Sequence, residues 1–112
     1  MVKERFIMST IVKVIIKEPR RKPEVKEIDA DDEINTLQKL VGGYFEAVHS
    51  PIEGVQIVAN EEGKSRKDLK PNFSYGYDFI FGTAIFCAYD KSGTMISLTE
   101  EQIEDVLHMY SC

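Results

Sequence analysis

One segment, residues 37–46 (LQKLVGGYFE), constrains the fold more than any other part of this chain. It ends a stretch in which apolar residues recur at spacings of three and four, as on one face of an amphipathic helix. These residues are Ile34, Leu37, Leu40 and Val41. Gly42 or Gly43 then supplies the left-handed residue with which many helices end. Because Tyr44 begins a short run that suits a strand, the sequence predicts a helix that passes directly into a strand.

Stretches rich in β-branched and aromatic residues predict the strands of a sheet. They cover residues 10–17, 23–28, 44–48, 55–59 and 79–89. The last stretch is the most apolar, so we expect it to be the central strand, with Gly82 permitting a bulge. The second is flanked by prolines and charges, which suit an edge strand. Residues 60–77 follow no regular pattern.

A second helix is predicted near the end of the chain. Thr99 and Gln102 have the spacing of a capping box, in which each side chain satisfies a backbone amide of the other residue. Together these patterns predict a single α+β domain with a mainly antiparallel sheet of about five strands. We expect two amphipathic helices, near residues 30–41 and 99–110, to pack on one face of that sheet.

The composition fits one globular domain, with 43% hydrophobic and 29% charged residues. We expect this domain to span residues 9–112, after an N-terminal extension over residues 1–8. No apolar run approaches the roughly 18 residues that cross a membrane, and no secretory signal is expected. Cys87 and Cys112 are interpreted as free thiols, which indicates a reducing compartment and therefore the cytoplasm.

The net charge of −5 comes from 14 basic and 19 acidic residues, which is a mild excess on a mixed surface. A mimic of DNA phosphates would carry a denser set of carboxylates. Generic binding of duplex nucleic acid is disfavoured as well, because phosphate contacts need a basic face.

No pattern typical of a catalytic or metal site stands out. The glycine pair follows a helix, whereas phosphate-binding glycines precede one. His49 and His108 have no second ligand at zinc spacing, and the acidic group at 29–33 fits helix capping better than a calcium loop. Cys87 is expected to be a small buried residue, with a Cys–His pair assembled by the fold left open. We therefore expect no enzymatic activity, no cofactor and no metal.

The best candidate for a functional site lies in residues 64–77. Four basic residues and one aspartate within 64–70 are followed at once by tyrosines, an asparagine and a glycine. Cations can hold phosphates while aromatic faces stack on a base. The candidate ligand-binding residues are Lys64, Arg66, Lys67, Asn72, Tyr75 and Tyr77. The alternative is a solvated charged turn followed by aromatic residues that enter the core.

A series of short motifs resembles one protein family. The series comprises Leu37-Gln38, Val41-Gly42-Gly43, Glu46, Asn60-Glu61, Gly63-Lys64, Asn72, Ile80-Phe81-Gly82, Asp90, Gly93 and Ser97-Leu98-Thr99-Glu100-Glu101. Over about residues 9 to 110 the chain resembles a domain-of-unknown-function family (number 3846) of small proteins of phages, plasmids and other mobile elements. The family is uncharacterised, so the resemblance implies a context, that of a mobile-element accessory protein in a bacterial host cell, and no catalytic residue.

Three hypotheses for the function follow. The first is counter-defence, in which the protein sequesters a small phosphate-bearing signal such as a nucleotide. The second is a protein–protein inhibitor that blocks a host nuclease or another defence factor. The third is an accessory role in phage or plasmid replication. We favour a homodimer or larger assembly over a monomer, because two copies of a small domain can form a cleft that one copy lacks.

Overall fold

The computed structural model describes residues 10–111, so the expected extension over residues 1–8 lies outside the described residues, as does Cys112. The elements follow one another as β1 (Ile11–Lys17), β2 (Glu24–Asp29), the 3-10 helix η1 (Ala30–Asp32), α1 (Glu33–Val41), β3 (Phe45–His49), β4 (Gln56–Asn60), β5 (Pro71–Tyr75), β6 (Asp78–Phe81), β7 (Ala84–Tyr89), β8 (Met95–Ile96) and α2 (Glu100–Met109). Neither α-helix is long and apolar enough to cross a membrane.

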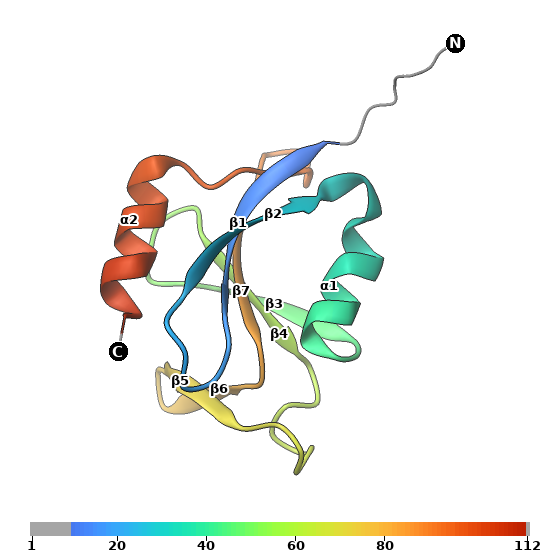
Figure 1. The fold of residues 1–112 in the computed structure, drawn as a ribbon, viewed down its shortest axis with the longest axis vertical. Helices are drawn as coiled ribbons and strands as arrows, with labels where there is room; N and C mark the ends of the chain where they lie inside the picture. Colours follow the sequence, from blue (N-terminus) through green and yellow to red (C-terminus); the bar gives the residue numbers. More distant parts are fainter. Residues whose placement is uncertain (1–9, 112) are drawn as a thin grey trace.

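The main sheet has the strand order β2-β1-β7-β4-β3, and each neighbouring pair is antiparallel (Figure 1). The short strand β8 pairs with the end of β7, while β5 and β6 form a separate antiparallel hairpin. The predicted α+β class and the mainly antiparallel sheet are therefore confirmed.

Strand β7 is buried on both faces. Its side chains alternate between two cores, with Ala84, Phe86 and Ala88 on one side. Ile85 and Cys87 point to the other side. A strand that needs cover on both faces reads as a continuous apolar run rather than an alternating one.

The two helices consequently lie on opposite faces of the sheet (Figure 1). Helix α1 packs Leu37 and Val41 into the core that contains Ile85. Helix α2 packs Val106 into the core that contains Phe86. The expectation that both helices share one face was wrong, because one face of β7 would then have stayed in water.

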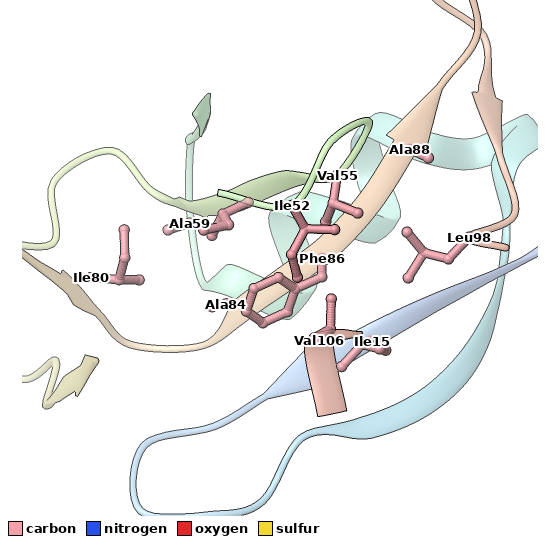
Figure 2. Packing of buried hydrophobic residues seen from close by; sticks show 11 residues of the cluster. Ile15, Ile52, Val55, Ala59, Ile80, Ala84, Phe86, Ala88, Leu98 and Val106 are labelled. Carbon is pink, nitrogen blue, oxygen red and sulfur yellow. The ribbon is translucent and has the colours of Figure 1, made fainter. Parts of the chain in front are cut away.

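The core under α2 is built around Phe86 (Figure 2). Phe86 stacks on Phe73 of β5 with ring centroids 5.8 Å apart, and both rings lie within 5 Å of Tyr110 at 4.7 Å and 4.8 Å. Aromatic pairs in such geometries add stability beyond their buried area. These contacts attach the β5–β6 hairpin to the same face as α2.

Both predicted helix signals are confirmed. Gly42 ends α1 in the left-handed conformation with φ 79°, and its amide donates to the Gln38 carbonyl. Thr99 and Gln102 form a complete capping box at the start of α2, with bonds of 2.9 and 3.1 Å.

Residues 79–89 are two strands rather than one. Gly82, with φ 77°, turns the chain between β6 and β7, and a Cβ at this position would lie 3.3 Å from a methyl group of Leu69. This bend separates β6 from β7, and β6 pairs with β5, which lies in the stretch that showed no regular pattern. Proline at the first position and a bulge after it shorten the regular part of β5 and hide its alternation.

The turn between β1 and β2 holds the one non-glycine residue with positive φ among residues 10–111. Arg20 has φ 65°, and the Arg21 amide donates to the Glu18 carbonyl at 3.1 Å. Proline followed by a left-handed residue is the pattern of a type II turn, which normally has glycine or asparagine in the third position. Arg20 therefore holds a strained backbone conformation.

We predict that Arg20→Gly raises the free energy of unfolding by about 0.5–1 kcal/mol. Removing the steric cost of a left-handed residue, about 1–2 kcal/mol, outweighs the roughly 0.4–1 kcal/mol of unfolded-chain entropy that glycine adds. Urea denaturation measures the difference. Arg21→Gly is the matched control and should destabilise, because Arg21 has no positive φ. A loss of stability in Arg20→Gly would contradict the assignment of strain.

Candidate functional site

The loop between β4 and β5, residues 61–70, is held in shape by its own backbone. Amides of Gly63, Ser65 and Leu69 donate to carbonyls three residues earlier, at 3.2, 3.0 and 3.4 Å. The loop is thus a series of tight turns, and its side chains project from fixed positions.

Two side chains, of Asn60 at the end of β4 and of Arg66 in the loop, fasten this region to the end of α1. Arg66 donates from Nη1 to the Gly42 carbonyl at 2.8 Å, and Asn60, which is buried, donates from Nδ2 to the Val41 carbonyl at 3.1 Å. Arg66 also makes a two-pronged ion pair with Asp68 at 3.0 and 2.6 Å. That hydrogen-bonded pair raises the pKa of Arg66 and lowers that of Asp68. Carbonyls at a helix end lack partners within the helix, so these bonds complete α1.

Asn72 of β5 connects the end of β1 to the bend between β6 and β7. Its Nδ2 donates to the carbonyls of Lys17 and Gly82, both at 2.8 Å. Its Oδ1 is buried and has no hydrogen-bond partner among residues 10–111. Both amide hydrogens are therefore occupied within the fold and the remaining acceptor is buried, so the structure gives Asn72 a structural role rather than a ligand contact.

The two candidate tyrosines have different surroundings. Tyr75 packs against the core under α2 and donates its hydroxyl to the His49 carbonyl at 2.9 Å. Tyr77 lies in the turn between β5 and β6 and is fully exposed, and Phe79 next to it is about half exposed. Of the rings on the β5–β6 hairpin, those of Tyr77 and Phe79 are the most exposed.

The candidate lysines also differ. Lys64 forms an ion pair with Asp78, which lowers the pKa of that carboxyl group and brings the turn that carries Tyr77 against the start of the loop. Lys67 and Lys70 are exposed, and neither has an ion-pair partner among the residues that the structure describes. The structure thus places Lys64 and Lys67 on one loop, with Tyr77 next to the Asp78 that pairs with Lys64. Arg66 holds this loop against α1.

A cleft of about 390 Å³ lies between the β3–β4 pair, the start of the loop and β6. Apolar side chains from β3, β4 and β6, such as Val48 and Ile80, line it. Its charged lining consists of Glu46, Glu61, Glu62, Asp78 and Lys64. Four carboxylates to one ammonium group disfavour a phosphate there. The sequence interpretation missed these carboxylates, because Glu46 lies 15 residues or more before the others and the strand pairing alone brings it to them.

The groups considered for catalysis or metal binding do not converge. Cys87 is fully buried, and its burial raises the thiol pKa to about 12. His49 on β3 and His108 on α2 are exposed. No three histidine, cysteine or carboxylate side chains within residues 10–111 lie close enough to hold a metal ion. A protonated, enclosed thiol is a poor nucleophile.

The fold and the loop define a small α+β protein with an exposed basic and aromatic surface and an acidic cleft beside it. The chain belongs to the family described as domain of unknown function DUF3846, whose model matches residues 12–111. The family resemblance read from the sequence motifs is thereby confirmed. No curated protein and no solved structure matches the chain.

We predict that Cys87 does not react with iodoacetamide in the native protein and reacts once urea unfolds it, as measured by mass spectrometry in a Cys112→Ser background. The folded thiol keeps its proton to about pH 12, whereas the reference thiol loses it near 9.0. The unfolded state therefore loses this proton first, and stability falls as the pH rises through that interval. Between about pH 8 and 10, wild type should lose about 1 kcal/mol more than Cys87→Ala. Alkylation of the native thiol would contradict the assignment.

We also predict that Asn72→Ala lowers the free energy of unfolding by about 2 kcal/mol, because two hydrogen bonds to backbone carbonyls are lost. Asn35→Ala removes an exposed bond to Asp32 and serves as the control, with an expected change below about 0.5 kcal/mol. Equal effects of the two substitutions in urea denaturation would show that Asn72 does not tie the strands together.

Proposed function

We propose that this protein is a non-enzymatic binding protein that holds a phosphate-bearing ligand on loop 61–70. The observation that carries the proposal is the exposure of Lys67 and Lys70 without carboxylate partners among the described residues. Lys64 of the same loop pairs with Asp78, which follows the exposed Tyr77 at the tip of the β5–β6 hairpin. Ammonium groups bind phosphate oxygens, and an exposed ring offers a face to a nucleobase.

The rigid attachment of the loop supports this proposal. Arg66 and Asn60 fix the loop to α1, so Lys67 and Lys70 project from a preorganised backbone. Preorganised groups lose less conformational entropy on binding, and the affinity rises accordingly. In this proposal Arg66 supports the site rather than contacting the ligand.

The biological setting that we propose is the cytoplasm of a bacterial host, where the protein serves a phage or another mobile element. Sequestration of a nucleotide signal of host defence would be one use of such a site. Its support is the chemistry of the loop together with the mobile-element context that the family resemblance suggests.

A second candidate function has an observation of its own. The four carboxylates around the cleft could face a basic groove of a host protein, as an inhibitor of a nuclease would require. Copurification separates the two functions: protein isolated from defence-activated cells would carry a nucleotide in the first case and a host protein in the second.

The test of the proposal is binding of ATP and of a fluorescein-labelled oligothymidylate, measured by calorimetry and fluorescence anisotropy. Lys67→Gln/Lys70→Gln should weaken binding of at least one of these ligands about tenfold or more, because each lost charge-assisted bond contributes about 1.5–3 kcal/mol. Lys39→Gln/Lys91→Gln removes the same charge elsewhere and should change affinity less than twofold. Binding of neither ligand, or equal losses in both variants, would overturn the proposal.

A further inference from the structure

Positive charge is concentrated in two segments of the chain. Segments 17–22 and 64–70 hold eight of the 14 lysine and arginine residues and only two carboxylates. The basic residues are Lys17, Arg20, Arg21, Lys22, Lys64, Arg66, Lys67 and Lys70. The chain as a whole has a net charge of −5, so these segments differ sharply from the rest.

The fold brings the two segments to one end of the molecule (Figure 1). Asn72, two residues after Lys70, donates to the Lys17 carbonyl at 2.8 Å, and the Gly82 amide donates to the Lys70 carbonyl at 2.7 Å. The end of β1 and the start of β5 therefore lie against each other. The β1–β2 turn and loop 61–70 extend from these two neighbouring points.

The β1–β2 turn is rigid. Lys17 is only 2% exposed and donates from Nζ to the carbonyls of Arg21 and Glu18 at 2.9 and 3.4 Å. Burial lowers the pKa of Lys17, and no described carboxylate pairs with it. Prolines 19 and 23 restrict the same turn. This internal bracing holds the side chains of Arg20, Arg21 and Lys22 outward, where all three are exposed.

Two further features mark this turn. Arg20 keeps a left-handed conformation that glycine would adopt without strain, and strained backbone of this kind is frequent at functional sites. A shallow hollow of about 280 Å³, lined partly by Arg21, Lys22 and Lys26, lies beside it, with Glu18 and Glu24 also in its lining. Glu24 pairs with Lys26 at 3.2 Å, which leaves Arg21 and Lys22 as the cations facing outward.

We propose that the β1–β2 turn and loop 61–70 form one surface that binds the sugar–phosphate backbone of single-stranded nucleic acid. This inference rests on the proposed function and names its ligand class. A mononucleotide would need a cleft that buries most of its surface, and the 390 Å³ cleft is lined by four carboxylates. A chain of phosphates instead matches two basic segments on an open surface. The exposed rings of Tyr77 and Phe79 can stack on unpaired bases, which a duplex does not offer.

The test uses fluorescence anisotropy with a labelled oligothymidylate of about 12 nucleotides. The turn variant is Arg20→Gln/Arg21→Gln/Lys22→Gln, and the control Lys13→Gln/Lys39→Gln/Lys91→Gln makes the same change in net charge elsewhere. The turn variant should bind at least about tenfold more weakly, and the slope of log K against log salt should fall by about 2, since each phosphate contact to a single strand contributes about 0.7. The control should stay within about twofold of wild type in affinity.

Arg20→Gly separates binding from folding. It removes one cation and relieves backbone strain, so it should weaken oligonucleotide binding several-fold while its melting temperature rises. Weaker binding by a more stable protein could not be attributed to loss of structure. Unchanged affinity in both Arg20→Gly and the turn variant would overturn the inference.

The outcomes distinguish the inference from the proposed function. If Lys67→Gln/Lys70→Gln weakens binding and the turn variant does not, the two-segment surface is wrong and the proposed function stands. If ATP or inorganic triphosphate displaces the oligonucleotide at equal phosphate concentration, the ligand is a small polyphosphate and the inference fails. Equal affinity for a duplex of the same length would also overturn it. If no phosphate-bearing probe binds, both proposals fail.

Discussion

The structure depends on the burial of β7 from both sides. Phe86 and Cys87 are adjacent in sequence, yet each is completely buried in a different core. Each face of the strand must be covered to remove its apolar area from water. Helix α1 therefore covers one face, and α2 with the β5–β6 hairpin covers the other (Figure 1). Every other element is placed relative to this strand.

Hydrogen bonds from polar side chains join distant segments of the chain in addition to the apolar packing. Asn60, Arg66 and Asn72 each donate to backbone carbonyls of distant elements, at a helix end or at a strand end. A buried carbonyl without a partner would cost a substantial part of the stability of a small domain. Asn60, Arg66 and Asn72 thus hold loop 61–70 and β5 in position. Two of them, Arg66 and Asn72, belong to the candidate segment 64–77. Of the lysines between Asn60 and Asn72, Lys64 pairs with Asp78, while Lys67 and Lys70 have no ion-pair partner among the described residues.

Much of the fold could be predicted from the sequence where the signal is local. The left-handed end of α1 and the capping box of α2 depend on residues within one or two turns, and both could be predicted. The placement of the helices on the sheet could not be predicted. Helical periodicity shows which face of a helix is buried, but not on which face of the sheet that helix packs. The run 79–89 also contained the bend at Gly82 that separates β6 from β7, and a glycine at this place in the sequence predicts a bulge equally well.

The candidate site was partly predictable for the same reason. Adjacent charges and rings in 64–77 are visible in sequence, so Lys64, Lys67 and Tyr77 could be selected from it. The structural tasks of Arg66 and Asn72 depend on carbonyls 24 and 55 residues away. The proximity of segments 17–22 and 64–70 depends on the same long-range contacts, and no local sequence pattern predicts it.

The two ends of β1 have opposite electrical surroundings. Its start lies beside the acidic first turns of η1 and α2, through bonds from Thr10 to Asp31 and from Leu98 to Lys13. Its end leads into the basic turn. Such a separation of charge along β1 contributes to a dipole moment of the molecule. The field of a neighbouring polyanion can orient that dipole before contact, over about a Debye length of 8–10 Å. The protein would therefore approach such a partner with one end foremost, despite its negative net charge.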